Sequence, residues 1–501
     1  MKKYILAIDQ STAGTKALVV HRNGQIVAKC SADHRQIYTQ PGWVEHDAIE
    51  IYENVKQMAR EALQQAAIAA VDLAAISITN QRETAVLWDR ETGLPVYNAI
   101  GWQCQRTAGL CAELRTAGWE RAVKNKTGLM LDPYFSAAKW SWMLEHTKGA
   151  KVLLQQGRLL AGTIDSWLIW KLTGGKTHAT DYTNASRTSL FNIHTLGWDD
   201  ELCGLFGVPL ELLPEVKFSD DCFGHTADSE LFPEEVPISG VIGDSQAALF
   251  GQLCLEPGEA KATYGTGTSV LMNIGDRLVA SGNGLVTAIA WGRGGKVTYA
   301  VEAIIRSSGD TVKWVRDNLG LFSSFKELED MLRLTPDNEG VYLVPAFVGL
   351  GAPYWYPNAR AAVTGMSRSA GKAHIVRAAV ESIAYQVRDA AELIEKETGI
   401  PLTKLNADGG ASANPLLMQF QADLLNLPVR TSDIAELSAI GSIYLAGLGA
   451  GLWTSMDEIT RVNRQGQQYN PLFDVTVREH LYQGWRMAVA AVLSDTNRAA
   501  R

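Results

Sequence analysis

Residues 4–20 read Tyr4-Ile-Leu-Ala-Ile-Asp9-Gln-Ser-Thr-Ala-Gly-Thr-Lys16-Ala-Leu-Val-Val20. Two β-rich runs, at 4–8 and 17–20, enclose a polar turn, which predicts a hairpin with a wide loop that could hold a phosphate. A carboxylate at a strand end, such as Asp9, can hold Mg²⁺, and small residues let backbone N–H groups approach a phosphate. An ordinary hairpin turn has the same composition, so this segment alone leaves both interpretations open.

Outward from this turn, strand-like and helix-like segments alternate, which predicts an α/β fold. Residues 49–70 have apolar side chains at helical spacing, and residues 73–79 read as a buried strand. The middle of the chain repeats the opening pattern, with a strand that leads into Asp244 and with a Gly-Thr-Gly turn at 265–267. This similarity predicts two related halves with a cleft between them. We place these halves at 1–252 and 253–501.

A third glycine-rich turn lies at residues 407–414, between a strand-like run at 402–405 and a helix-like run at 415–425. A glycine turn before a helix N-terminus suits the phosphates of a nucleotide. Neither G-x-G-x-x-G nor G-x-x-x-x-G-K-[ST] occurs, so a Rossmann site and a P-loop are not supported. Three such turns, each after a strand, together favour a phosphate-binding site over unrelated loops.

Composition limits the function classes further. The 501 residues are 46% apolar and 20% charged, with a net charge of −8, which is typical of a globular protein and argues against a nucleic-acid partner. Six cysteines without a Cys-x-x-Cys pair indicate reduced thiols. No apolar run is long enough for a signal peptide or a membrane span. We therefore expect a cytoplasmic protein with no membrane partner.

Several longer motifs occur in a fixed order along the chain. They are residues 41–47 (Pro-Gly-Trp-Val-Glu-His-Asp), 80–84 (Asn-Gln-Arg-Glu-Thr), 97–104, 132–136 (Asp-Pro-Tyr-Phe-Ser), 181–188 and 349–355. Through these motifs, and through signatures at 134–146 and 361–381, the chain resembles the FGGY family of carbohydrate kinases, and within it the glycerol kinases. The resemblance extends from about residue 4 to about residue 450.

The resemblance implies a two-domain actin/hexokinase-type (ribonuclease H-like) ATPase fold, in which each domain is a mixed sheet flanked by helices. It implies an enzyme that uses ATP and Mg²⁺ and transfers the γ-phosphoryl group to a hydroxyl of a small polyol or sugar. It places the polyol mainly on the half at 1–252 and ATP mainly on the half at 253–501. It leaves a homodimer or a homotetramer open. A different class of function is a non-catalytic ATP-switch protein of the same superfold, which would have no need of a polyol site.

The resemblance also assigns roles by position. Asp244 falls on the catalytic base, which would accept the proton of the attacking hydroxyl. Asp9 falls on the magnesium-associated carboxylate. The substrate contacts would be Arg82, Glu83, Trp102, Tyr134, Asp244, Ser245 and Ser269. The ATP contacts would be Thr12, Ala13, Gly14, Lys16, Thr266, Gly309, Lys313, Gly410 and Asn414.

The departures from the glycerol kinases lie mostly at the substrate positions. Those enzymes typically carry Gln where this chain has Ser245, and Phe where it has Ser269. The smaller hydroxyl side chains predict a pocket for a longer or more polar substrate, while glycerol itself stays the alternative. The acidic residues 228–235 replace a glycine–arginine loop of some bacterial relatives, so we expect no inhibition by a sugar bisphosphate.

Overall fold

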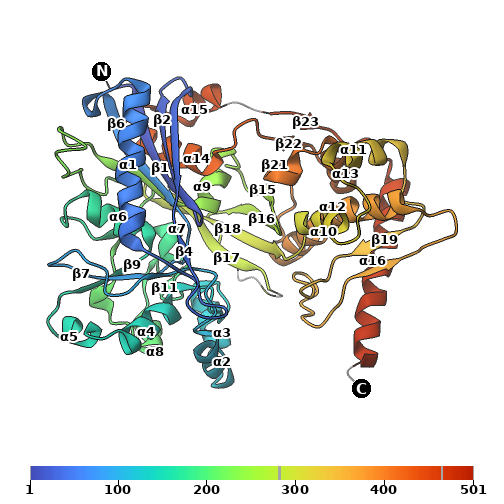
Figure 1. Cartoon of the computed structure of the whole chain (residues 1–501), viewed down its shortest axis with the longest axis horizontal. Coiled ribbons are helices and arrows are strands. Elements are labelled where there is room, and N and C mark those ends of the chain that lie inside the picture. Colours follow the sequence, from blue (N-terminus) through green and yellow to red (C-terminus); the bar gives the residue numbers. More distant parts are fainter. Residues whose placement is uncertain (1, 280–281, 283, 464–465, 500–501) are drawn as a thin grey trace.

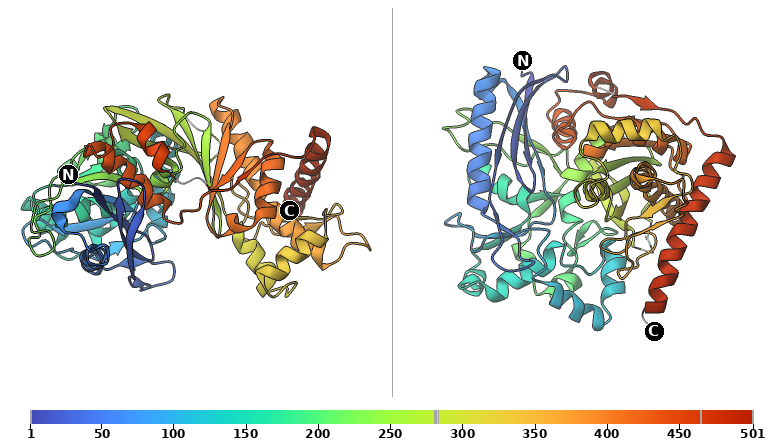
Figure 2. Two further views of the ribbon diagram at one scale, coloured as in Figure 1. Left: turned by 90° about the horizontal axis from the view of Figure 1, so that it is seen from above. Right: turned by 45° about the vertical axis from the view of Figure 1, so that its right-hand side comes forward.

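The structure is a computed structural model, and it describes residues 2–279, 282, 284–463 and 466–499. Two lobes lie side by side along the long axis of the molecule (Figure 1). Seen from above, the strands of the second lobe stand between its own helices and the first lobe (Figure 2). Among the described helices, none is long and apolar enough to cross a membrane.

The first lobe contains a five-stranded mixed sheet in the order β14-β6-β1-β2-β3. Its central strands are almost wholly buried, because helices cover both faces, so they read as continuous apolar runs. Helix α1 (Ala48–Ala66) packs on β2 and β3 and ends earlier than predicted, where Ala67 turns left-handed. The strands are β1 (Tyr4–Gln10), β2 (Gly14–His21), β3 (Ile26–Asp33), β6 (Leu73–Asn80) and β14 (Ile238–Gly243).

The second lobe contains a seven-stranded sheet in the order β17-β18-β16-β15-β21-β22-β23. Its strands are β15 (Glu259–Tyr264), β16 (Thr268–Gly275), β17 (Val286–Arg293), β18 (Lys296–Ile305), β21 (Lys404–Asp408), β22 (Val429–Thr431) and β23 (Gln468–Tyr469). Helices α10 (Gly309–Asp317), α12 (Lys372–Thr398), α13 (Pro415–Leu425) and α16 (Val475–Ala499) belong to this lobe, and α16 projects from it (Figure 1).

The two sheets share a core pattern. In the first, β1 pairs antiparallel with β2 and parallel with β6; in the second, β15 pairs antiparallel with β16 and parallel with β21. This confirms the predicted similarity of the halves, but one detail of that prediction was wrong. Asp244 does not enter a turn: it begins helix α9 (Asp244–Gly251), where a carboxylate in the first turn is favoured by the helix dipole. The equivalent of the opening hairpin is β15–β16.

A late segment of the chain, residues 437–453, returns to the first lobe before the chain ends in α16. Helix α14 (Leu437–Gly449) packs against α9 and the five-stranded sheet, and the indole N–H of Trp453 donates to the carbonyl of Arg22 at 3.0 Å. A Cβ at Gly441 would lie 1.8 Å from the carbonyl oxygen of Ala247, so only glycine permits this approach. This segment follows residue 253 in the sequence but lies on the first lobe, so the predicted boundary at residues 252 and 253 does not separate the lobes here. That the first half binds mainly the substrate and the second mainly ATP stays a prediction.

Candidate active site

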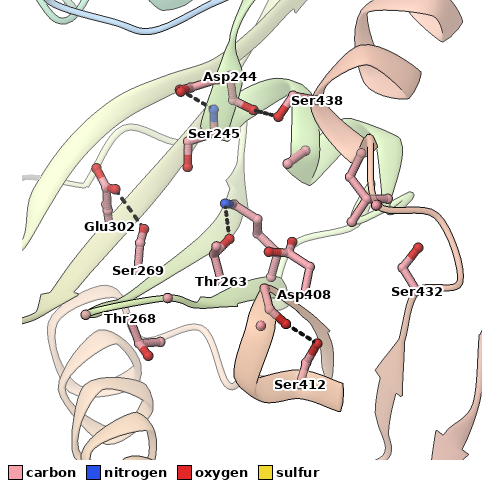
Figure 3. Close-up of a pocket in the computed structure, with 18 of the residues that line it drawn as sticks. Asp244, Ser245, Thr263, Thr268, Ser269, Glu302, Asp408, Ser412, Ser432 and Ser438 are labelled. Atoms are coloured by element: carbon pink, nitrogen blue, oxygen red, sulfur yellow. Dashed lines mark hydrogen bonds between the residues drawn. The ribbon is translucent and has the colours of Figure 1, made fainter. Parts of the chain in front are cut away.

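A cavity of about 1120 Å³ is lined by residues of both lobes. Figure 3 shows part of its lining, with Asp244 and Ser245 on one side and Ser269, Thr268 and Ser412 on others. All seven side chains predicted to contact the substrate line this cavity, although they come from distant parts of the sequence. They are Arg82, Glu83, Trp102, Tyr134, Asp244, Ser245 and Ser269.

Asp244 presents its carboxylate at the start of α9. The side chain is 38% exposed, so a ligand in the cavity can reach it. Its Oδ1 accepts a hydrogen bond from the backbone N–H of Ser245 at 2.7 Å and lies 3.2 Å from Nε of Arg82. A Cβ at Gly243 would lie 2.8 Å from Cγ of Arg82, so the glycine before Asp244 makes room for the arginine.

Four buried charges of alternating sign form a closed ring beside Asp244. Arg187 Nε donates to Glu83 Oε1 at 2.5 Å, and Arg187 Nη1 donates to Glu302 Oε2 at 3.2 Å. Arg82 completes the ring, with Nη2 at 3.8 Å from Glu302 Oε1 and Nε at 3.9 Å from Glu83 Oε1. Glu83 adopts a left-handed backbone with φ of 62°, which is uncommon for a residue other than glycine.

The ring keeps Glu302 and Arg82 charged. Burial alone would raise the pKa of Glu302, but Arg82 and Arg187 lower it to about 2. Burial would likewise lower the pKa of Arg82, yet Glu83, Glu302 and Asp244 hold that pKa above its usual value. Because each charge has opposite charges beside it, the polar end of the cavity is fixed by ion pairs before any ligand arrives.

Two aromatic side chains supply an apolar wall. The rings of Trp102 and Tyr134 lie 5.3 Å apart, and the indole N–H of Trp102 donates to Thr12 Oγ1 at 2.9 Å. Behind them, the ammonium of Lys139 donates to the carbonyls of Tyr134 and Phe135, and burial lowers the pKa of Lys139 to about 8. The aromatic wall is thus attached to the hairpin turn on one side and to a buried lysine on the other.

Asp9 lies near the end of β1, opposite Lys16 in the antiparallel register. Burial raises the pKa of Asp9 to about 6; Lys16 opposes this shift, and Asp244 adds to it. Within the residues that the structure describes, no hydrogen bond or ion pair reaches its carboxylate. The turn is tighter than predicted, because the strands extend to Gln10 and resume at Gly14.

The remaining predicted phosphate contacts of this turn differ in position. Thr12 lines the large cavity. Ala13, Gly14 and Lys16 lie outside its lining: Ala13 is exposed, Lys16 is half-buried, and Gly14 is buried against β3. A Cβ at Gly14 would lie 2.6 Å from the carbonyl oxygen of Ala32, so close packing against β3 also requires a glycine at this position.

A second cavity, of about 530 Å³, lies in the second lobe, and the turns at 265–267 and 409–414 contribute to its wall. Much of its lining is apolar, with Val312, Phe325 and Leu328 among the side chains. Asn414 caps α13 by accepting hydrogen bonds from the N–H groups of residues 416 and 417. All five ATP contacts predicted in the C-terminal half line this cavity: Thr266, Gly309, Lys313, Gly410 and Asn414.

A family model for the N-terminal domain of the FGGY family of carbohydrate kinases matches residues 4–251, and one for its C-terminal domain matches residues 260–450. The chain belongs to this family. A glycerol kinase of Xanthomonas campestris is 50% identical over 98% of this chain and 99% of its own length. A glycerol kinase of Symbiobacterium thermophilum is 51% identical over 97% and 98%. The crystal structure of Plasmodium falciparum glycerol kinase with ADP has a TM-score of 0.93, at 36% identity over 98% of both chains.

These findings confirm the two-domain kinase fold and the enzyme class predicted from the sequence. As an FGGY kinase, the chain uses ATP to phosphorylate an alcohol of a polyol or sugar. The comparisons do not favour the alternative of a non-catalytic ATP-switch protein. The polar residues beside Asp244 point the same way, since a switch protein needs no polyol site.

Sequence reasoning missed three charged residues of the large cavity or its surroundings in this FGGY kinase. Glu302 and Arg187 belong to the ring, and Lys261 lines the cavity, where its ammonium donates to Thr263 Oγ1 at 2.8 Å (the dashed line at Thr263 in Figure 3). Lys261 forms no ion pair within the described ranges. The available signal was charge inside apolar strands, because Lys261 and Glu302 interrupt the runs 260–264 and 299–305.

Proposed function

We propose that Asp244 is the general base of this kinase and that the polyol lies in the large cavity against Trp102 and Tyr134. The observation that carries the proposal is the position of the Asp244 carboxylate. It is 38% exposed to a cavity whose other walls offer donors, acceptors and aromatic rings. A base within hydrogen-bond reach of a substrate hydroxyl can accept its proton as the phosphoryl group arrives.

The neighbouring side chains suit a polyol. The guanidinium of Arg82 has only donors, and the carboxylate of Glu83 has only acceptors, so together they can bind both sides of a pair of hydroxyls. Trp102 and Tyr134 would pack on the carbon face of the same molecule. Phosphoryl transfer depends mainly on positioning and charge neutralisation, and the ion pairs of the ring supply the positioning.

The nucleotide has its own place in this proposal. Its base would lie against the apolar side chains of the second cavity, and its phosphates would follow the turns at 265–267 and 409–412 toward the large cavity. These turns line both cavities, which supports a path from one to the other. Lys261 contributes a positive charge near that path, where the transferred group carries most of its negative charge.

Magnesium fits the residues at Asp9. In the described parts of the chain, no group of three or more His, Cys, Asp or Glu side chains could hold a metal ion by itself. Mg²⁺ is commonly held by one or two carboxylates together with substrate phosphates and water, and Asp9 offers one buried carboxylate that has no partner among the described residues. When bound there, the ion would neutralise phosphate charge, and Asp9 would orient it.

Substrate length is the open part of the proposal. Ser245 and Ser269 are small and polar where glycerol kinases typically carry Gln and Phe, which supports a substrate of four to six carbons. The relatives at about 50% identity named glycerol kinase favour glycerol instead. A coupled assay with C3–C6 polyols and ketoses separates the two. We expect a C4–C6 substrate to exceed glycerol at least about tenfold in kcat/KM; preference for glycerol would identify it as the substrate.

We also propose that the protein works in the cytoplasm. All six cysteines are free thiols, which supports a reducing compartment. Cell fractionation with the native protein tests this location. A homodimer or a homotetramer stays a prediction, and light scattering coupled to size-exclusion chromatography would determine the assembly.

A further inference from the structure

Glu302 differs from the other three members of the charged ring in its origin. Arg82, Glu83 and Arg187 all belong to the part of the chain matched by the N-terminal family domain, whereas Glu302 lies on β18 of the second lobe. Its side chain is 3% exposed, yet it lines the large cavity. The ring is therefore closed by one carboxylate that the opposite lobe provides.

The position of Arg82 depends on a balance among three carboxylates, those of Asp244, Glu302 and Glu83. Its Nε lies 3.2 Å from Asp244 Oδ1, its Nη2 lies 3.8 Å from Glu302 Oε1, and its Nη1 donates to Gln246 at 3.1 Å. Glu302 attracts the guanidinium away from Asp244. Without this charge, Arg82 would be drawn to the remaining carboxylates, including the proposed base, because buried opposite charges attract strongly.

The second arginine depends on Glu302 as well. Arg187 is held by Glu83 at one nitrogen and by Glu302 at another, and its Nη2 has no partner within the described residues. Loss of Glu302 would leave a buried guanidinium with a single carboxylate, Glu83. The carboxylate of Glu83 would then be occupied more fully by Arg187 and less available to a substrate hydroxyl.

Ser269 connects Glu302 to the cavity wall. Its hydroxyl donates to Glu302 Oε1 at 2.8 Å (Figure 3), on the same oxygen that faces Arg82. The bond fixes the rotamer of Glu302 from the second lobe. A phenylalanine at this position could not make it, so the serine affects the ring as well as the volume of the pocket.

We propose that Glu302 is a positioning residue that holds Arg82 and Glu83 in place for the polyol, with Ser269 orienting it. The inference rests on the proposed function of the same cavity and adds a residue to it. Glu302 acts through the two arginines, so its removal should affect polyol binding and turnover. The affinity for ATP should stay unchanged, because Glu302 does not line the second cavity, where we propose that the nucleotide base lies.

The test compares Glu302→Gln with a matched buried glutamate, Glu45→Gln, in the full-length enzyme. Glu45 is 1% exposed, pairs with Arg106 at 2.6 Å and accepts from the hydroxyl of Tyr97 at 2.9 Å, and it lines neither cavity. Both variants lose a buried charge beside an arginine, so both should unfold at a lower temperature. Only Glu302→Gln should change the KM of the polyol without changing the KM of ATP.

For Glu302→Gln we expect the KM of the best polyol of the panel to rise about 10- to 100-fold, because small displacements of positioning groups have effects of this size. The KM of ATP should stay within about threefold. For Glu45→Gln, both constants should stay within about threefold. Calorimetric titration with the polyol alone should show the same loss of affinity in Glu302→Gln.

Ser269→Ala keeps the test usable if Glu302→Gln does not fold. We expect a several-fold rise in polyol KM without a change for ATP, and no further effect when it is combined with Glu302→Gln. Equal changes for both substrates, or an unchanged polyol KM, would overturn the inference while the wild type stays active. A wild type that phosphorylates no polyol of the panel would overturn the proposed function and the inference together.

Discussion

The polar end of the large cavity and the second cavity, called the nucleotide cavity after its proposed ligand, differ in what lines them. The first presents charged side chains that are held by one another, as in the ring of Arg82, Glu83, Arg187 and Glu302. The second presents glycine turns and apolar side chains, and its one cap residue, Asn414, is used to start a helix. The hydroxyl groups of a polyol require hydrogen-bond donors and acceptors in fixed directions. A nucleobase requires an apolar surface, and the phosphates of the nucleotide require backbone N–H groups.

The difference predicts how each cavity responds to change. Breaking a buried ion pair leaves an uncompensated charge, so substitutions at the polar end should be severe and should affect chemistry or polyol binding. No ion pair joins the described residues that line the nucleotide cavity, so substitutions there should be milder and should appear mainly in the KM of ATP. Variants in the two cavities therefore test whether polyol binding and catalysis depend on one cavity and ATP binding on the other.

The largest effect should come from Asp244→Asn. The change keeps the shape of the side chain and removes the carboxylate, so turnover should fall about 10²- to 10⁴-fold, the usual contribution of a general base. The KM of ATP should stay near that of the wild type, because Asp244 does not line the nucleotide cavity. Steady-state kinetics at saturating polyol measure both.

Asp200→Asn is the matched control for this variant. Asp200 is also the first residue of a helix, α8 (Asp200–Phe206), and it is exposed and lines neither cavity. The control removes a carboxylate from a helix start and should leave turnover within about twofold. A turnover of Asp244→Asn within a few-fold of the wild type would show that another group accepts the proton.

The next effect concerns the length of the substrate. Ser245→Gln combined with Ser269→Phe should reverse the preference, so that the ratio of kcat/KM between the best C4–C6 substrate and glycerol changes by about 100-fold. The physical reason is that an amide and an aromatic ring fill the space of the extra carbons. Competition between the two substrates in one assay measures the ratio directly. An unchanged ratio would mean that these two positions do not set substrate length.

Much of the architecture could be predicted from sequence because the decisive signals were local. The buried strand at 73–79, the hairpin after Tyr4 and the helix at 415–425 follow from short apolar runs, turn residues and caps. Helix α14 is apolar on all sides, so its sequence predicts burial without saying that it returns to the first lobe. Its place depends on a long-range contact that local patterns do not contain.

The same limit applies to the site. The seven predicted substrate contacts follow from the family resemblance, and the structure brings them into one cavity, although their role stays a prediction. Arg187 and Glu302 could not be assigned in this way, because a buried charge has meaning only through its partner. The ring joins residue 83 to residue 187 and residue 187 to residue 302, and no spacing along the chain predicts those pairs.

A smaller effect should appear at Asp9 as a dependence on pH. Its pKa of about 6 means that the carboxyl is about 90% ionised at pH 7 and about 10% ionised at pH 5. Only the ionised form can attract Mg²⁺, so the apparent Kd of the enzyme for magnesium–nucleotide should rise about tenfold over this range beyond the change caused by titration of ATP itself. Asp9→Asn should bind magnesium–nucleotide more weakly at pH 7 and lose this part of the pH dependence. If the Kd of Asp9→Asn changed with pH as the wild-type Kd does, Asp9 would not be the group that titrates.

The smallest effect should come from the glycine turns of the nucleotide cavity, where two positions form a matched pair. A Cβ at Gly309 would lie 2.5 Å from the carbonyl oxygen of Gly265, whereas a Cβ at Gly410 would have no protein atom within 4 Å. Gly309→Ala should therefore lower the stability of the protein by about 1–3 kcal/mol, as overpacking usually does. Gly410→Ala should unfold at or slightly above the wild-type temperature, since alanine restricts the unfolded chain.

The added methyl group at position 410 would instead occupy space that the proposed path gives to the phosphates, so the KM of ATP should rise about threefold to tenfold with the polyol KM unchanged. Thermal unfolding and ATP kinetics of the pair separate packing from binding, and a wild-type KM for ATP in Gly410→Ala would mean that the phosphates do not pass over this turn.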